Sequence, residues 1–227
     1  MKKRWFITGD LHGALHSITN FIQEHNLGKE SNIIVLGDMG IAWRKDLVDY
    51  NFKITRYEER CNGVHLYWLD GNHENFDIIS SWSLNKDGIY DNSPHIHYCS
   101  RGSSILINGA KALFIGGADS IDKVFRKEGL DWWPRETIDK KDIENIKGKY
   151  KYVFSHCCPK SIFDNYKMFL CTLTNINENN VIHSSEEKLE QVKNNITYDK
   201  WFFGHYHVNC RLDNKHHCLF EDFIEVE

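Results

Sequence analysis

The fold is decided by the stretch Trp5-Phe6-Ile7-Thr8-Gly9-Asp10-Leu11-His12-Gly13, in which an apolar run stops at Gly9 and polar residues follow. The same form occurs at four later places, where β-branched or aromatic residues end at Gly or Ser beside Asp, Asn or His. These places are residues 33–38, 66–74, 152–156 and 201–207. Each apolar run is predicted to be a buried strand that ends in a loop.

The polar clusters at the ends of these runs share a small set of residue types. In order they are Gly9-Asp10-Leu11-His12-Gly13, Gly37-Asp38, Gly71-Asn72-His73-Glu74, Ser155-His156 and Gly204-His205-Tyr206-His207. Ligands of open α/β sheets bind beyond the carboxyl ends of the strands, so we expect the five clusters to converge. Asp, Asn and His suit Mn, Fe or Zn, whereas thiolate sites need closely spaced Cys pairs. The clusters therefore predict a dinuclear metal centre with hydrolytic chemistry.

Length and composition predict a globular protein with one domain. The chain has 227 residues, of which 41% are hydrophobic and 26% charged, and this suits a single domain, residues 1–227, with a full hydrophobic core. The net charge of -4 argues against a protein that grips long duplex nucleic acid, which needs a basic surface. Small anionic substrates remain compatible, because two bound divalent cations would reverse the local charge.

The sequence also indicates a cellular compartment. The basic N-terminus precedes only four apolar residues, which is too short for an export signal, and no run approaches the roughly 20 apolar residues that cross a bilayer. The seven cysteines are irregularly spaced, so we expect a reduced, cytoplasmic protein with no membrane partner. For the adjacent Cys157 and Cys158, a packing role is favoured over a redox role.

The order of the predicted elements favours a parallel sheet in the first third of the chain. Apolar residues recur at helical spacing in residues 14–25 and again in residues 47–61, so the chain begins β-α-β-α-β. Two short strands, residues 103–107 and 111–115, flank Asn108-Gly109, which is a type I′ hairpin signal.

Later elements are less regular. A helix is predicted around residues 138–146, and Ser184 resembles the start of a capping box before a second helix. Residues 208–212 and 217–225 are expected to pair with each other as a hairpin. Residues 159–183 lack clear periodicity, and we interpret them as a long loop that forms a substrate lid or a surface insertion.

The five clusters, in this order and each after a predicted strand, resemble those of the calcineurin-like metallophosphoesterase superfamily, over residues 9–207. The resemblance implies an α/β fold, a two-sheet β-sandwich core flanked by helices with a βαβαβ start. It implies that one metal ion is held by Asp10, His12 and His207, and the other by Asn72, His156 and His205. Asp38 would bridge both ions. The expected metal is Mn, with Fe, Zn or Ni as alternatives.

The chemistry that the resemblance implies is hydrolysis of a phosphate ester. Two metal ions about 3.5–4 Å apart clamp the phosphate, and a bridging hydroxide attacks phosphorus in line. His73 is expected to protonate the leaving oxygen and not to bind metal. The ligand pairs Asp10/His12 and His205/His207 are two residues apart, so their side chains share one side if the backbone is extended.

The chain departs from the protein Ser/Thr phosphatase and diadenosine tetraphosphatase branch of this superfamily. That branch carries Asp and Arg where this chain has Ile41 and Ala42, and Arg where it has Asp70. The lost phosphate contact could come from Arg44 or Arg126, because the arginine fork suits phosphate. Asp70 or Asp119 are candidates to orient His73.

Two adjacent tryptophans, Trp132 and Trp133, could stack on a nucleobase, although covering the edge of the core is the favoured interpretation.

These observations favour an enzyme that hydrolyses a small phosphodiester or nucleotide-type substrate. The alternative is a phosphomonoesterase of the protein phosphatase or diadenosine tetraphosphatase kind. An alternative of another class is a metal-binding interaction module that kept the fold without the chemistry. The sequence leaves the oligomeric state open.

Overall fold

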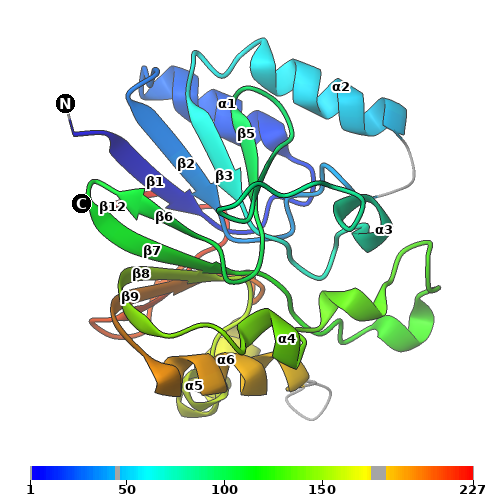
Figure 1. The fold of residues 1–227 in the computed structure, drawn as a ribbon, viewed down its shortest axis with the longest axis vertical. Helices are drawn as coiled ribbons and strands as arrows, with labels where there is room; N and C mark the ends of the chain where they lie inside the picture. Colours follow the sequence, from blue (N-terminus) through cyan, green and yellow to red (C-terminus); the bar gives the residue numbers. More distant parts are fainter. Residues whose placement is uncertain (1, 44–46, 175–182, 227) are drawn as a thin grey trace.

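The structure is a computed structural model that describes residues 2–43, 47–174 and 183–226, with no side-chain description for residues 47, 48 and 172–174. Two six-stranded sheets face each other, and helices cover the outer face of each sheet (Figure 1). This arrangement confirms the predicted α/β sandwich with helices outside. Among the described residues, no helix combines the length and apolarity that a bilayer crossing requires.

The first sheet has the strand order β12-β1-β2-β3-β5-β4. Its strands are β1 (Arg4–Thr8), β2 (Ser31–Val35), β3 (His65–Trp68), β4 (Ile89–Asp91), β5 (Ile96–Cys99) and β12 (Ile224–Val226). The four central strands are parallel, and the two edge strands, β4 and β12, are antiparallel. The β-α-β-α-β start is therefore confirmed. The sequence patterns did not reveal β4 and β5, which are only three and four residues long.

The second sheet repeats this plan with the order β10-β11-β9-β8-β7-β6. Its strands are β6 (Ser104–Ile107), β7 (Ala110–Ile115), β8 (Gly148–Ser155), β9 (Ile196–Phe203), β10 (Cys210–Arg211) and β11 (His216–Cys218). The predicted β6–β7 hairpin is confirmed, with φ of 49° at Asn108 and 85° at Gly109, as a type I′ turn requires.

The expectation for the C-terminal strands is only partly right. β10 and β11 pair with each other, as predicted, but β12 leaves this sheet and pairs with β1 of the first sheet. β12 pairs with β1 because this position buries its apolar side chain at the edge of the first sheet. Val226 is buried against the core between the sheets, which a local hairpin would not achieve.

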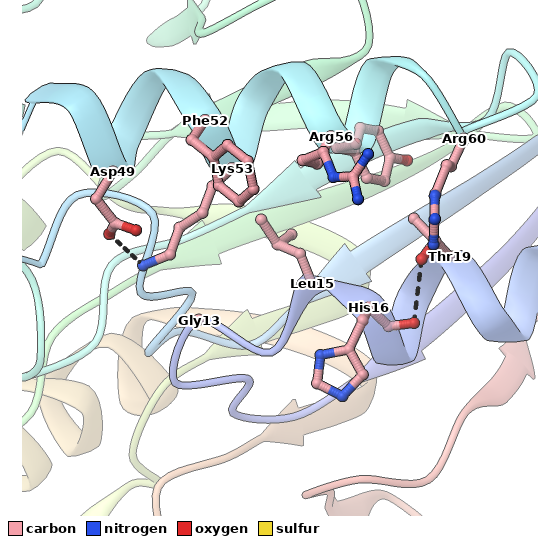
Figure 2. Close-up of a pocket in the computed structure, with 10 residues that line it drawn as sticks. Gly13, Leu15, His16, Thr19, Asp49, Phe52, Lys53, Arg56 and Arg60 are labelled. Carbon is pink, nitrogen blue, oxygen red and sulfur yellow. Dashed lines mark hydrogen bonds and ion pairs between the residues drawn. The ribbon is translucent and has the colours of Figure 1, made fainter.

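Two layers of helices complete the fold. α1 (Leu15–Glu24), α2 (Leu47–Glu58) and α3 (Phe76–Ile79) belong to the first sheet, and α4 (Lys140–Ile143), α5 (Lys160–Thr174) and α6 (Ser184–Asn195) to the second. Short 3-10 turns lie at Lys123–Phe125 and Pro134–Glu136. α1 and α2 lie side by side, and residues on their facing sides line a cavity (Figure 2).

The interpretation of residues 159–183 as a long loop is wrong for most of the segment. Residues 160–174 form α5, whose Ile162, Phe163 and Leu170 are buried in the core of the second sheet. These residues are spaced as one face of a helix, a period that the polar residues between them obscured. Residues 175–182 of the expected lid lie outside the described residues.

Two further expectations for helices need correction. The predicted capping box at Ser184 is wrong, because His183 occupies the N-cap position and makes no capping side-chain bond. Instead, Asp119 Oδ2 accepts a hydrogen bond from the backbone N–H of Ser185, at 2.7 Å. The helix predicted over residues 138–146 is the single turn α4, which Asp139 does cap with a capping box.

Three apolar cores hold these layers together. One lies between the first sheet and its helices, one between the second sheet and its helices, and one between the two sheets. The core between the sheets contains residues of the apolar runs that precede the polar clusters, among them Ile7, Ile34, Leu69, Phe154 and Phe202. Burial on both faces explains why these runs are continuously apolar instead of alternating.

The cysteines belong to this packing. Six of them form no disulfide bond, namely Cys61, Cys99, Cys157, Cys158, Cys210 and Cys218. Cys157 and Cys158 are buried in the core of the second sheet. Burial raises the pKa of both thiols well above the ordinary value, which keeps them protonated and unreactive. The predicted packing role of this pair is in agreement with their position.

Candidate metal centre

The polar clusters lie in loops that follow parallel strands of both sheets. Asp10 and His12 follow β1, Asp38 follows β2, Asn72 follows β3, His156 follows β8, and His205 and His207 follow β9. The two sheets present the carboxyl ends of these strands to the same region, so residues almost 200 positions apart in the chain are in contact. The expected convergence is therefore found in the geometry.

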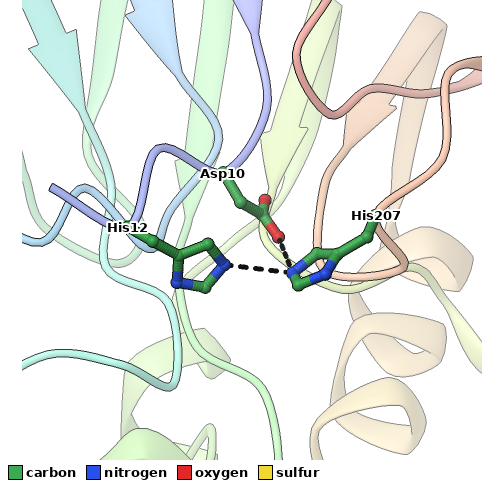
Figure 3. Close-up of side chains that lie close together, drawn as sticks. All are labelled: Asp10, His12 and His207. Carbon is green, nitrogen blue, oxygen red and sulfur yellow. Dashed lines mark hydrogen bonds and ion pairs between the residues drawn. The ribbon is translucent and has the colours of Figure 1, made fainter. Parts of the chain in front are cut away.

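The first group of side chains consists of Asp10, His12 and His207 (Figure 3). The Nε2 atom of His207 lies 3.2 Å from Asp10 Oδ2 and 3.0 Å from His12 Nε2. Two imidazole nitrogens and a carboxylate oxygen thus point at one spot, within 4.8 Å of one another. A neutral imidazole pair with a carboxylate is a donor set that a divalent transition metal ion accepts.

The second group is built around His156, whose side chain is completely buried. Its Nε2 lies 3.2 Å from Asn72 Oδ1 and 3.4 Å from Asp38 Oδ2. Its other nitrogen, Nδ1, donates a hydrogen bond to the carbonyl of Leu36 at 2.6 Å. That bond leaves the Nε2 lone pair for the site, as the outer partners of metal-binding histidines commonly do. The ring of His205 lies 5.1 Å from the ring of His156, centroid to centroid.

Asp38 is the residue that both groups share. Its Oδ2 atom lies 3.4 Å from His156 Nε2 and 3.9 Å from His12 Nε2. Its Oδ1 atom accepts a hydrogen bond from the backbone N–H of His73 at 2.8 Å, which fixes the plane of the carboxylate. A single buried carboxylate therefore faces both sets of donors.

The protonation of the site fits a cation-binding role. Burial alone would lower the pKa of His156, but the carboxylates of Asp38 and Asp10 outweigh it and raise this pKa to about 10. Burial, with the nearby His156, lowers the pKa of His205 to about 3, so its ring is neutral. Without metal, the proton on His156 balances part of the negative charge of Asp38 and Asp10. A bound metal ion would balance the same charge. We expect metal binding to displace the proton.

The backbone around the site is strained in a consistent way. Among the described non-glycine residues, positive φ angles occur at His12 (47°), Asp38 (46°), His205 (68°) and His207 (48°), as well as at three asparagines in turns. The backbone at His12, His205 and His207 is therefore not extended, which was the condition for the two side chains of each ligand pair to share one side. The left-handed conformation turns each side chain back towards the site, and strain of this kind clusters where the fold over-determines a functional geometry.

Two glycines make room for the carboxylates. A Cβ atom at Gly71 would lie 2.0 Å from Asp38 Oδ1, and one at Gly204 would lie 2.2 Å from Asp10 Oδ1. No side chain fits at these distances, so the glycines in these clusters are required for the approach of the loops. Glu74 adds a further link, because its buried Oε1 accepts a hydrogen bond from the backbone N–H of Met39, next to Asp38.

Sequence reasoning assigned no role to Glu74, although it belongs to the Gly71–Glu74 cluster. Burial, with the nearby Asp38, raises the pKa of its carboxyl well above the ordinary value, so the group is neutral. A neutral acid adds no charge beside Asp38 while it ties the loop after β3 to the loop after β2.

His73 lies beside the first group and contacts two residues from other loops. Its Nε2 accepts a hydrogen bond from the Arg126 guanidinium at 3.0 Å, and its ring lies 4.8 Å from the Trp43 ring. Arg126 is held by an ion pair with Asp122 at 2.8 Å. Burial lowers the pKa of His73, Asp38 opposes this effect, and Arg126 adds to it. Arg44, the other candidate phosphate contact, lies outside the described residues.

Trp43 is a neighbour of His73 that sequence reasoning missed. The tryptophans it singled out lie elsewhere, since Trp133 is buried in the core of the first sheet, which supports the packing interpretation for that residue. Trp132 is half-buried. The only available signal for Trp43 was its nearness in sequence to Asp38.

The expectation that Asp70 or Asp119 orients His73 is wrong. Asp70 Oδ2 accepts hydrogen bonds from Arg101 Nη2 and Nε, at 2.7 and 2.9 Å, and Asp70 Oδ1 accepts one from the Tyr98 hydroxyl at 2.8 Å. Asp119 accepts hydrogen bonds from Thr137 and from the N–H of Ser185. Both carboxylates are therefore occupied by structural contacts.

Arg101 is the centre of a buried ion network beneath the site. Its side chain is 4% exposed, and it bridges Asp70, which is fully buried, and Asp142. Replacing Arg101 with Leu should lower the free energy of unfolding by about 3–5 kcal/mol, because two carboxylates would be left buried without their partner. Urea denaturation followed by tryptophan fluorescence measures this effect.

The matched control is Arg135→Leu, because Arg135 also pairs with Asp142 but its side chain is 39% exposed. We expect a smaller loss of stability there. A loss below about 1 kcal/mol for Arg101→Leu, the range of exposed pairs, would contradict the structural role of the network.

The comparisons with known proteins agree with this geometry. A family model described as calcineurin-like phosphoesterase matches residues 4–209. The match therefore contains strands β1 to β9 and every loop of the site. No curated protein matches the chain.

Proposed function

The chain belongs to the calcineurin-like phosphoesterase family, and from this premise we propose that it hydrolyses phosphodiester or nucleotide-type substrates with two divalent metal ions. The observation that carries the proposal is the position of Asp38, whose Oδ2 faces His156 on one side and His12 on the other. A carboxylate in this position can be shared by two ions.

The donor set fits two ions. Asp10, His12 and His207 would hold one, Asn72, His156 and His205 the other, and Asp38 both, with manganese as the proposed metal. When bound, such a pair of ions clamps phosphoryl oxygens and lowers the pKa of a water molecule that attacks phosphorus. The glycines and left-handed residues described above would hold these proposed ligands close together.

His73 is the proposed proton donor to the leaving oxygen, through Nε2. Burial lowers its pKa, so the ring is neutral at neutral pH before substrate arrives. A phosphate group beside it adds negative charge, which favours the protonated ring. The Arg126 guanidinium, now 3.0 Å from the same nitrogen, is placed to turn its fork to the phosphate, which would free Nε2 for the proton.

The surroundings of the site favour small substrates. Ile41 and Ala42 are 1% and 0% exposed, so the positions where protein phosphatases carry Asp and Arg face the core and offer no polar group to a phosphoprotein. The Trp43 ring beside His73 is partly exposed and provides a flat surface on which a base or aryl group can stack.

We also propose a cytoplasmic location. Cys61, Cys99, Cys157, Cys158, Cys210 and Cys218 form no disulfide bond, which fits a reducing compartment.

The proposal is tested by an activity panel on protein from which metal has been removed and Mn²⁺ returned. Bis(4-nitrophenyl) phosphate, linear dinucleotides, 4-nitrophenyl phosphate and a phosphopeptide should be compared, with EDTA as the metal-free control. We expect turnover that requires Mn²⁺ and a kcat/KM for the diesters that exceeds the values for the phosphopeptide. Two bound metal ions without turnover of any ester would instead favour the non-catalytic binding module.

A further inference from the structure

A second cavity lies between α1 and α2, on the outer face of the first sheet (Figure 2). Its volume is about 310 Å³, which reaches the lower end of the range of about 300–1,000 Å³ found for small-molecule sites. Nothing in the proposed chemistry uses it. Its lining brings together three cationic side chains, Lys53, Arg56 and Arg60, together with His16.

The polar groups of this cavity are mostly cationic. Arg56 pairs with Glu59 at 3.2 Å, and both side chains are about half exposed. Lys53 pairs with Asp49 Oδ2 at 2.6 Å. Among the described residues, the three cations therefore outnumber the two carboxylates with which they pair, in a chain whose net charge is -4.

The hydroxyl groups of the lining are already engaged. Thr19 donates to the carbonyl of His16, and Tyr57 donates to the carbonyl of Val64 at 2.9 Å. The groups that remain to meet a ligand thus include the His16 imidazole and the guanidinium groups, and guanidinium suits phosphate or carboxylate oxygens. Phe52 adds a flat apolar surface, because its side chain is 59% exposed and Arg56 lies over its ring at 5.7 Å.

Lys53 connects this cavity with the metal centre. A smaller cavity of about 150 Å³ is lined by His12, Gly40, Trp43, Lys53 and His73. Lys53 therefore lines both cavities, and its ammonium group donates to the carbonyl of Gly40 at 2.8 Å. The smaller cavity is also lined by His73, which is the proposed proton donor. The group that leaves phosphorus would depart on this side.

We propose that the cavity between α1 and α2 binds a second anionic group, a phosphate or carboxylate, carried by the leaving group of the substrate. This inference rests on the proposed function and narrows its substrate class. The preferred substrates are phosphodiesters whose leaving nucleoside, or comparable group, carries a further phosphate. The same side chains would also bind a free anion that is not part of the substrate. The experiment therefore has to distinguish a group on the substrate from a free anion.

The test uses the double variant Arg56→Gln/Arg60→Gln, which leaves Lys53 and the metal centre unchanged. The two substrates are a thymidine dinucleotide and the same dinucleotide with a terminal phosphate on its leaving nucleoside. In the Mn²⁺-loaded variant, the KM of the phosphorylated dinucleotide should rise at least about tenfold relative to the KM of the other. Calorimetric titration of metal-free protein with inorganic pyrophosphate should show the same loss of affinity.

The matched control is Arg4→Gln/Arg211→Gln, which removes two exposed arginines away from both cavities. An unchanged ratio of KM values in the Arg56→Gln/Arg60→Gln variant would overturn the inference, and unchanged pyrophosphate binding would do so as well. Loss of pyrophosphate binding with an unchanged ratio of KM values would assign the cavity to an independent anion and overturn the substrate assignment.

The experiments also distinguish failure of the proposed function from failure of the inference about the cavity. If wild-type protein binds no metal and leaves bis(4-nitrophenyl) phosphate intact, the proposed function fails. If that ester is hydrolysed and only the ratio of KM values fails to change, the inference about the cavity fails alone.

Discussion

Replacing Asp38 with Asn removes both metal ions from their sites at once and reduces turnover by more than about hundredfold. Loss of an outer hydrogen-bond partner of a metal ligand already costs about 10–100-fold. Asp38 is a proposed ligand itself and not an outer partner, so its loss should cost more. Its Oδ2 faces both donor groups, while its Oδ1 accepts the N–H of His73. An amide cannot supply the negative charge that two cations share. Metal content after dialysis, measured by mass spectrometry, and kcat for bis(4-nitrophenyl) phosphate report the effect.

The control for this variant is Asp199→Asn, an exposed aspartate on β9. It removes the same charge from the chain and should leave metal content and turnover unchanged. An Asp38→Asn protein that keeps two metal ions at wild-type affinity would contradict the shared position of this carboxylate.

Replacing His73 with Gln lowers kcat by about 10²–10⁴ for substrates with poor leaving groups, because the departing oxygen then lacks a proton donor. The loss should be much smaller for 4-nitrophenyl esters, whose leaving group is stable as an anion. Metal content should stay at two ions per chain. The His73 ring does lie close to His12 and Asp38, at 5.2 Å from the His12 ring, but its Nε2 atom is hydrogen-bonded to Arg126 and its backbone N–H is hydrogen-bonded to Asp38. Glutamine keeps that backbone bond.

The comparison requires kcat for a dinucleotide and for bis(4-nitrophenyl) phosphate in the same preparation. His25→Gln, an exposed histidine at the end of α1, serves as the control. Equal losses for good and poor leaving groups would speak against proton donation, and a parallel loss of metal would make His73 a ligand.

The sequence could predict the strands that carry the site because their apolar runs are buried on both faces. A continuous apolar run can be recognised in the sequence without knowledge of which strands pair with it. The polar cluster that follows each run then marks the loop at the end of the strand. The pairing of β12 with β1 had no local signal, since it depends on a contact between residues more than 200 positions apart. Local patterns favoured the hairpin instead.

The parts of the site that the sequence did not predict depend on tertiary contacts. The structural role of Asp70 could not be predicted because its partner, Arg101, lies on a different loop. The two residues meet only when the fold buries them together. The left-handed backbone at His12, His205 and His207 has no signature in the residue types, because histidine adopts it only where the surrounding loops impose it. The neighbours of His73 were likewise visible only after folding.

We propose that the five clusters hold two metal ions with Asp38 between them. Crystals grown with Mn²⁺ and measured at a wavelength where manganese scatters anomalously would reveal the ions directly. We expect two anomalous peaks about 3.5–4 Å apart, one beside Asp10, His12 and His207 and one beside Asn72, His156 and His205, with the Asp38 carboxylate between them. A single peak at saturating Mn²⁺, or peaks away from Asp38, would contradict it.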